Sequence, residues 1–170
     1  MIRSIQTRLR RAGLAALGSL LLMQAGATLA DEPPAAPPAA PQYQDIDIDR
    51  LVTTARPEKK GTSAFFKPSP VRFSGRIKQG PRKRDVEYLY TALSFFPLDP
   101  KPQVSHRMFV ETPGGHILPV YVDDSQVAGL EKLGEGAAAT FSGWHVYNYS
   151  KGPAILVVGF ERAPLAMLTP

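Results

Sequence analysis

The residues best suited to contact a ligand form two short clusters in the 170-residue chain. One is Tyr147-Asn148-Tyr149-Ser150-Lys151-Gly152, and the other is Arg82-Lys83-Arg84, which ends a segment from Arg72 with six basic residues and no acidic one. Aromatic rings stack on flat ligands, and guanidinium and ammonium groups bind phosphate or carboxylate. We therefore predict a ligand-binding set of Arg82, Lys83, Arg84, Tyr147, Tyr149 and Lys151. The alternative is a solvated basic turn, with tyrosines that close one end of the fold.

Residues that could support catalysis are few and widely spaced. His106, His116 and His145 fall on three separate predicted strands, without H-x-H or H-E-x-x-H spacing. His106 and His116 bracket one hairpin and could face each other across it, but a pair without a third ligand is more often structural. The sequence contains no G-x-S-x-G elbow and no glycine-rich phosphate loop after a strand. We therefore expect a protein that is not an enzyme, with no catalytic residues, metal or cofactor.

The first 30 residues have the layout of a secretory signal peptide. Residues 1–13 hold four arginines and no acid, residues 14–23 are apolar, and small residues precede Ala27 and Ala30. We predict cleavage after Ala27 or Ala30 and a periplasmic or secreted location; an uncleaved membrane anchor is the alternative. Without residues 1–30, the 20 basic side chains fall to 16 against 15 acidic ones, a net charge of +1. The near-neutral remainder argues against a general nucleic-acid binder, and the absence of cysteine excludes disulfides.

The remaining chain is predicted to be a mainly β domain behind a disordered N-terminal region. Residues 31–42 form a proline- and alanine-rich linker, and residues 43–70 are a weakly structured lead-in in which Asp47 or Asp49 could cap a short helix. From Val71, apolar and polar residues alternate as in a half-buried strand. Further strands are predicted over residues 106–112, 116–123, 138–148 and 153–162. A short helix is predicted from Asp124 or Ser125 to Leu133, with Gly134 as its end.

A repeated tripeptide connects two of these strands. Phe73-Ser74-Gly75 recurs as Phe141-Ser142-Gly143, in the first and fourth predicted strands. Gly143 separates the inward phases of Phe141 and Trp144, as a β-bulge does. With the order of the elements, these features make residues 71–162 resemble the oligonucleotide/oligosaccharide-binding (OB) fold, without matching a particular family.

The resemblance implies a five- or six-stranded barrel over residues 71–165, with one short helix between strands three and four. Ligands then lie across strands two and three, between two loops. Here those loops hold Gly80 to Arg84 and the cluster from Tyr147 to Gly152. The basic and aromatic clusters are therefore expected on one face.

The connection from Gln79 to Gln103 is too long for this pattern and could add a strand or helix. It carries Tyr88, Tyr90, Phe95 and Phe96, which would form an unusually apolar surface if exposed. Two hypotheses follow: a binding module for an anionic or carbohydrate envelope component, or an interaction subunit that docks on an envelope complex through residues 86–97. The expected partner is an envelope protein or an anionic polymer rather than nucleic acid. Contact with a membrane is expected only through an uncleaved N-terminal segment.

Overall fold

Alternating residues from Val71 to Ile77 belong to a strand much longer than the pattern alone indicates. Strand β2 (Ala64–Lys83) has 20 residues, and Val71, Phe73 and Ile77 all point into the core. The structure, a computed structural model, describes residues 41–55 and 62–163. The predicted signal peptide and residues 31–40 of the predicted linker lie outside the described residues.

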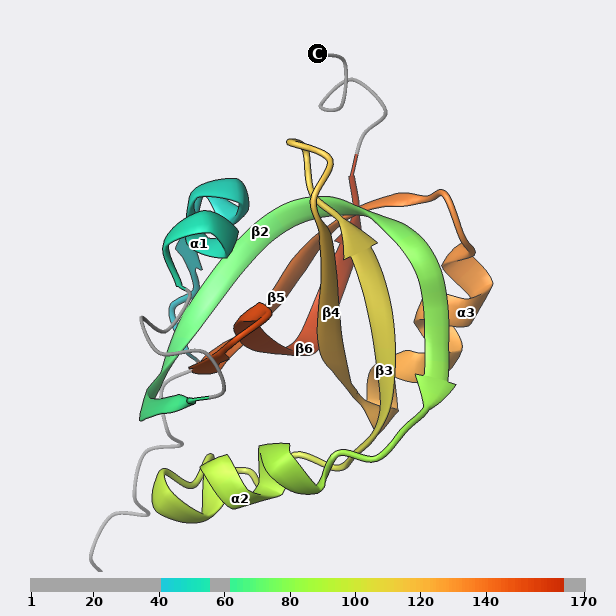
Figure 1. Cartoon of the computed structure of the whole chain (residues 1–170). Helices are drawn as coiled ribbons and strands as arrows, with labels where there is room; N and C mark the ends of the chain where they lie inside the picture. The colour runs from blue at the N-terminus through green and yellow to red at the C-terminus, as the bar shows by residue number, and fades with distance from the viewer. Residues whose placement is uncertain (1–40, 56–61, 164–170) are drawn as a thin grey trace, which may run out of the picture. The chain divides into compact units, whose positions relative to one another are not determined.

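The predicted mainly β character is confirmed, and the strands form a ring. They are β1 (Gln44–Asp45), β2, β3 (Val104–Glu111), β4 (Ile117–Asp123), β5 (Ala138–Tyr149) and β6 (Gly152–Arg162). Their order in the sheet is β1-β2-β3-β4-β6-β5, and β2 also pairs with β5, so that the sheet closes on itself (Figure 1). β4 and β6 run parallel, whereas the pairs β2–β3, β3–β4, β5–β6 and β2–β5 are antiparallel.

Three α-helices accompany the ring in the described residues, where the resemblance to the OB fold implies one. Helix α1 (Ile48–Thr54) begins after Asp47, whose side chain accepts a hydrogen bond from the N–H of Arg50. Helix α2 (Glu87–Phe95) lies in the long connection between β2 and β3. A 3₁₀ turn (Asp124–Gln126) leads into α3 (Val127–Leu133), which Gly134 ends with a φ of 86°.

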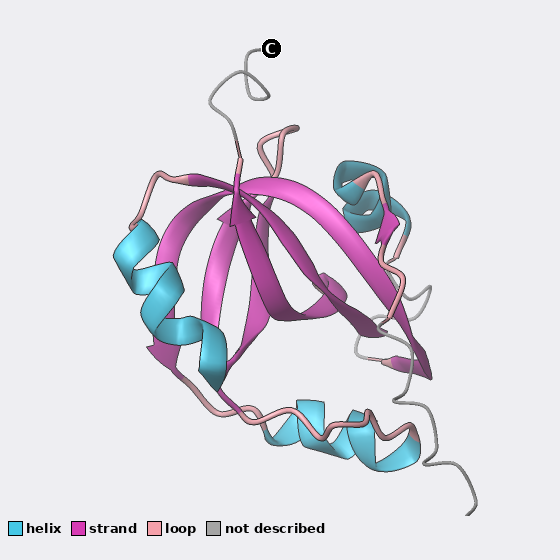
Figure 2. Ribbon diagram, turned by 180° about the vertical axis from the view of Figure 1, so that it is seen from behind, coloured by secondary structure: helices cyan, strands magenta, loops and turns pink. Residues whose placement is uncertain are grey.

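The main core fills the inside of the ring. Inward side chains of all five long strands pack together there, with Leu130 of α3 and Ile48 and Val52 of α1. The ribbon in Figure 2 shows the strands curving around this interior. The central position predicted for β6 is confirmed, because Ala154 to Val157 are all buried between β4 and β5. No helix in the described part of the chain combines the length and hydropathy that a membrane span requires.

A second core lies between α2 and the strands. Leu89, Ala92 and Leu93 of α2 pack against a group that includes Tyr121, Tyr147 and Leu156. Each of these three helix residues is less than 7% exposed: Leu89 0%, Ala92 2% and Leu93 6%. The long connection therefore contributes a helix with one buried face, and part of the segment proposed as a docking surface is core.

Two glycines of the repeated tripeptide allow the strands to approach closely. Phe73 lies directly opposite Phe141, with ring centroids 5.4 Å apart, so the two tripeptides pair across β2 and β5. A Cβ on Gly143 would lie 2.0 Å from the carbonyl oxygen of Leu156, and one on Gly75 would lie 2.5 Å from a methyl carbon of Val110. A register shift does lie between Ser142 and Gly143, but the extra residue is on β6. The predicted change of inward phase at Gly143 is therefore wrong: Phe141, Gly143 and His145 are all buried, and Trp144 between them is only half-buried.

The two predicted hairpins are confirmed. Within the first of them, Pro119 lies just before Val120, where the pairing of β4 with β6 begins, so the missing N–H of Pro119 removes no bond from that ladder.

Two expectations about loops are wrong. Residues 43–70, expected to be weakly structured, contain β1, α1 and the first part of β2. Residues Gly80 to Lys83, expected in a loop, extend β2: Arg82 and Lys83 pair with Arg107 and His106 of β3, and Gly80 and Pro81 lie in a register shift before them.

Substitution of Gly143 by alanine tests the close approach. The added Cβ would meet backbone rather than a movable side chain, so we expect the free energy of unfolding to fall by more than about 2 kcal/mol. Gly159→Ala is the matched control, because its nearest neighbour, the Cβ of Ser142, is 3.9 Å away. Urea unfolding curves measure both; equal losses for the two variants would contradict this account.

Candidate functional site

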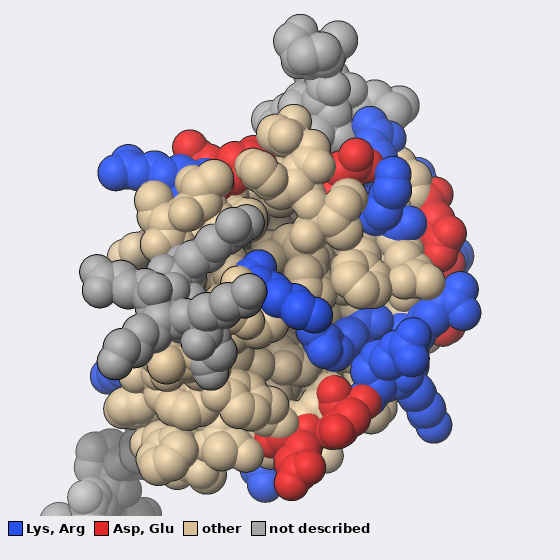
Figure 3. All heavy atoms as spheres, in the orientation of Figure 1, with Lys and Arg blue, Asp and Glu red and all other residues tan. Residues whose placement is uncertain are grey.

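A groove of about 400 Å³ crosses the outer face of β3 and β4. It extends from the end of β2 to the turn between β5 and β6, and Figure 3 shows Lys and Arg side chains gathered over this face. Four cationic side chains, one tyrosine and several apolar groups line it: Gln79, Arg82, Arg84, Arg107, Phe109, Ile117, Pro119, Tyr149 and Lys151. No acidic side chain or histidine is among these described lining residues.

Two of the cations are placed against each other by strand pairing. Arg82 of β2 lies directly opposite Arg107 of β3, and both line the groove. Like charges at directly opposite positions destabilise a sheet. Arg84 follows the strand, where its N–H donates to the carbonyl oxygen of Ser105 at 3.1 Å. The backbone therefore concentrates positive charge at this end of the groove.

The cations of the groove lack the carboxylate partners that other cations of the domain have. Arg72 lies at ion-pair distance from Asp45 and Glu161, and Lys78 from Glu111. Within the described parts of the chain, no carboxylate lies at such a distance from Arg82, Arg84, Arg107 or Lys151. An anion entering the groove would meet guanidinium and ammonium groups that no protein carboxylate already neutralises.

An aromatic ring lies against Arg107 in the groove. Its guanidinium is 5.1 Å from the ring centroid of Tyr121, and Tyr149 lines the same groove. Burial raises the pKa of Tyr149, while the charge of Arg107 opposes that rise. Tyr149 thus stays a neutral hydroxyl at physiological pH, able to donate a hydrogen bond to a bound anion.

An exposed apolar strip lies beside the cations. Phe109 of β3 is opposite Pro119 of β4, and the side chain of Ile117 lies near the hairpin turn. Phe109 is 36% exposed and Ile117 47% exposed. A flat ring at this position could stack on an unsaturated or sugar ring while the arginines bind negative charge.

Four of the six residues predicted to bind a ligand line this groove, namely Arg82, Arg84, Tyr149 and Lys151. Lys83 is exposed at the end of β2 but is not part of the lining. Tyr147 is only 2% exposed, and its hydroxyl lies 2.6 Å from that of Tyr121 inside the second core. Burial and this hydrogen bond raise the pKa of Tyr147 well above its usual range. The ring of Tyr147 is therefore a core group, as in the alternative stated for the sequence.

Sequence reasoning missed Arg107 and Phe109. Both belong to the strand His106–Thr112 as predicted, and their alternation with the buried Met108 and Val110 marked them as outward-facing. What the pattern does not contain is the pairing partner. Only the register between β2 and β3 shows that Arg107 joins Arg82.

The aromatic residues of α2, together with Phe96 directly after it, divide between surface and interior. Phe95 is 63%, Tyr88 46% and Phe96 36% exposed. Tyr90 instead faces the protein. Its hydroxyl accepts a hydrogen bond from the N–H of Val104 and donates one to the carbonyl oxygen of the same residue. Phe65 packs against Tyr88 and Phe95, with centroids 5.6 Å and 5.7 Å away, so these rings form one aromatic surface.

The histidines lie in separate hydrogen-bonded environments. His106 is opposite Val122 and far along the hairpin from His116, so the two do not face each other. Nδ1 of His106 lies 2.8 Å from the carboxylate of Asp124, which also accepts from the hydroxyl of Ser105. Nε2 of His145 lies 2.6 Å from the side-chain oxygen of Asn148, and burial lowers the pKa of His145. The described residues contain no group of three or more His, Asp or Glu placed to hold a metal ion.

Neither protein families nor curated proteins indicate a role for the site. No protein-family model matches the chain, and no curated protein is significantly similar to it.

The buried pair of tyrosine hydroxyls provides a test of where Tyr147 lies. Tyr147→Phe leaves the hydroxyl of Tyr121 buried without its partner, so we expect a loss of about 1–3 kcal/mol in the free energy of unfolding. The double variant Tyr121→Phe/Tyr147→Phe should lose less than the sum of the single variants, because no unpaired hydroxyl remains. Strictly additive losses in chemical denaturation would show that the two hydroxyls are independent.

Proposed function

We propose that the ring of strands is an OB-like barrel. The closure of β2 on β5, the first and fourth long strands, supports this assignment. The position of α3 between β4 and β5, the third and fourth long strands, supports it as well. β1, α1 and α2 are additions to that pattern. In such a barrel the outer face of the second and third long strands, here β3 and β4, is the surface that takes a ligand.

The function that we propose is that of an exported, non-catalytic binding or adaptor module of the periplasm. Its groove across β3 and β4 would hold an anionic or carbohydrate component of the cell envelope. The observation that carries this proposal is the unneutralised pair Arg82 and Arg107, which the register places side by side at a cost in stability. Retention of like charges at one site is expected where a ligand supplies the opposite charge.

The composition of the groove favours binding over proton transfer. Its ionisable side chains are those of arginine, lysine and tyrosine. General acid–base catalysis most often uses histidine or a carboxylate, and neither is among the described residues that line the groove. The apolar strip of Phe109 and Ile117 adds a surface for a ring or chain carried by the anion.

Reversal of charge at both arginines tests the groove. For Arg82→Glu/Arg107→Glu we expect at least about tenfold weaker binding of dextran sulfate, because two attractive contacts become repulsive. Uncharged dextran is the matched ligand, and titration calorimetry at fixed salt measures both. Binding by the unaltered protein should also weaken steeply as salt concentration rises.

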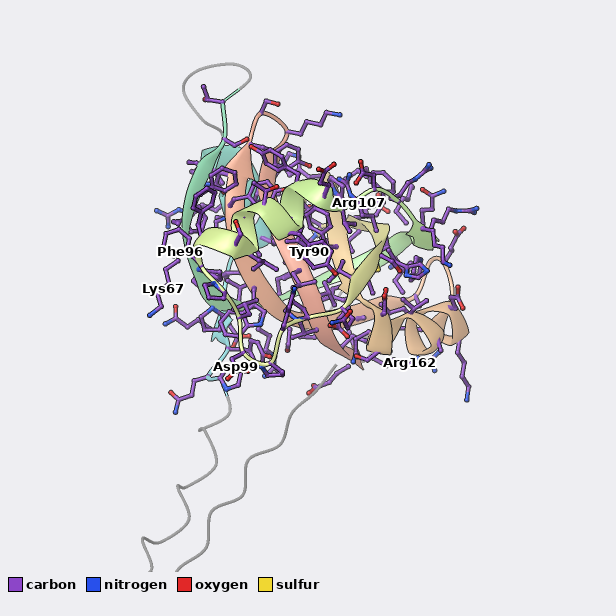
Figure 4. All side chains as sticks on the ribbon, turned by 90° about the horizontal axis from the view of Figure 1, so that it is seen from below. Lys67, Tyr90, Phe96, Asp99, Arg107 and Arg162 are labelled. Carbon is purple, nitrogen blue, oxygen red and sulfur yellow. The ribbon has the colours of Figure 1, made fainter. Side chains whose placement is uncertain are left out.

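The control variant is Lys67→Glu/Arg162→Glu, which changes net charge equally. Figure 4 shows Lys67 and Arg162 away from Arg107, and neither lines the groove. The control should bind dextran sulfate within about twofold of the unaltered protein. Equal weakening in both variants would mean that net charge, rather than the groove, attracts the polymer. A neutral Arg82→Gln variant should bind less tightly without loss of thermal stability, since it relieves the Arg82–Arg107 repulsion.

A second function, docking on an envelope protein complex through residues 86–97, is favoured by one observation. Phe95 and Tyr88 are large, exposed and stacked on Phe65, so they present an apolar surface to solvent. The buried face of the same helix carries Leu89 and Leu93. Only the outer face is therefore free to meet a partner.

Point substitutions separate the two faces of α2. Phe95→Ser removes the most exposed ring, so we expect it to reduce chemical cross-linking to an envelope protein without lowering the thermal midpoint. Ser94→Ala, an exposed neighbour, is the control and should cross-link normally. Deletion of residues 86–97 should unfold the domain, because it removes part of the second core. Unchanged cross-linking by Phe95→Ser would eliminate this surface as the docking site.

A further inference from the structure

A second pocket, of about 460 Å³, lies on a different side of the domain from the cationic groove. Tyr43, the α2–β3 connection around Asp99 and Lys101, the end of β4 at Asp123, and Trp144 of β5 surround it. Figure 2 shows the connection on the rear of the domain, and Figure 4 shows Asp99 and Arg107 on opposite sides with Tyr90 between them. Its volume lies within the range of small-molecule sites, roughly 300–1,000 Å³.

Two aromatic rings form walls of this pocket. The ring centroids of Tyr43 and Trp144 are 6.4 Å apart, and the ring planes meet at 64°. Both side chains are half-buried, so neither ring is fully enclosed by protein. An aromatic face of this kind is a flat apolar surface that accommodates the C–H face of a sugar ring.

The polar groups around the rings carry both signs of charge and both kinds of hydrogen-bonding capacity. Asp99 and Asp123 are acceptors, whereas Lys101 is a donor. Oδ1 of Asp123 already accepts from the N–H of Ser125 at 3.0 Å and from its hydroxyl at 2.6 Å. No hydrogen bond involves Oδ2 of Asp123 among the described residues, and no ion pair there involves Asp99, Lys101 or Asp123.

This combination bears on the charge of the ligand. Asp99 and Asp123 would repel a carboxylate or phosphate, and Lys101 offsets part of their attraction for a cation. A hydroxyl group can donate to a carboxylate and accept from an ammonium group, so a ligand with several hydroxyls suits all three side chains. The same ligand needs one apolar face to match Trp144 and Tyr43.

We propose that this pocket binds a neutral saccharide, with Trp144 and Tyr43 against the ring and Asp99, Lys101 and Asp123 bonded to hydroxyls. The site is independent of the anion-binding groove, which lacks carboxylates and faces another direction. A chain with both sites would hold a neutral glycan at one surface and an anionic group at the other.

Trp144 makes the proposal directly measurable, because it is the only tryptophan of the chain. Protein produced from the full chain is titrated with chitotriose, cellotriose and maltotriose while its tryptophan emission is recorded. We expect a saturable change in emission, with a shift to shorter wavelength, for at least one of these sugars, because the sugar displaces water from the indole. Dextran sulfate, which should occupy the groove, should leave the emission unchanged.

Variants locate the response. Tyr43→Ala and Asp99→Ala should each weaken binding of the responding sugar at least about tenfold, whereas Arg107→Glu should not alter it. Asp99 is exposed, so Asp99→Ala keeps the test valid if Tyr43→Ala does not fold. No saturable response to any of the three sugars would overturn the proposal. So would a response to tetramethylammonium alone, which would make the pocket a cation site, or undiminished binding by folded variants.

Discussion

Strand β2 pairs with β5 along its first part and with β3 along its last part, and the change of partner takes place at Arg76, which pairs with both. Gly75 lies next to this change of partner, where a Cβ would come within 2.5 Å of a methyl carbon of Val110 and 3.0 Å of the carbonyl oxygen of Glu111 on β3. The ring and the core within it depend on this change of partner, because it links β5 and β3 through one strand. The groove exists because the last residues of β2 are carried alongside β3, which brings Arg82 to Arg107.

Charge is distributed unevenly over the surface that results. Arg72 and Lys78 of β2 have carboxylates beside them, whereas Arg82, farther along the same strand, has another arginine. Exposed ion pairs contribute little to the free energy of unfolding. The fold therefore loses little stability by having no ion pairs in the groove. Tyr121 and Tyr147 matter more, since their bonded hydroxyls fix the layer of rings on which Arg107 rests.

Local sequence patterns predicted the elements that a few neighbouring residues are enough to specify. The turn at Pro113-Gly114-Gly115, the alternation in the hairpin strands and the apolar run of β6 each need only a few neighbouring residues. The Phe-Ser-Gly repeat even indicated the pairing of β2 with β5. Composition also identified most of the cationic lining, because Arg82, Arg84 and Lys151 stand in clusters.

Other features depend on register, which local patterns do not contain. A shift between His145 and Tyr147 interrupts the alternation of β5, so that His145, Val146 and Tyr147 are all buried and Tyr147 leaves the surface. The extension of β2 past Gly80 and Pro81 arises because Arg82 and Lys83 resume the pairing with β3, although glycine and proline usually favour turns. The groove around Arg107 and the pocket beside Trp144 are each lined by residues from distant segments of the sequence, which only the folded chain brings together.

The position of β6 has a consequence for the order in which the chain acquires its structure. β6 is the last strand of the described chain, yet it lies between β4 and β5 and pairs in parallel with β4. Until residues 152–162 are available, β4 and β5 each present an unpaired edge, and the inside of the ring has no closing wall. Closure thus depends on contacts between residues far apart in sequence, a topology that folds slowly. We propose that this chain crosses a membrane before it folds. Slow closure of the ring would then leave the chain unfolded until β6 has also crossed the membrane.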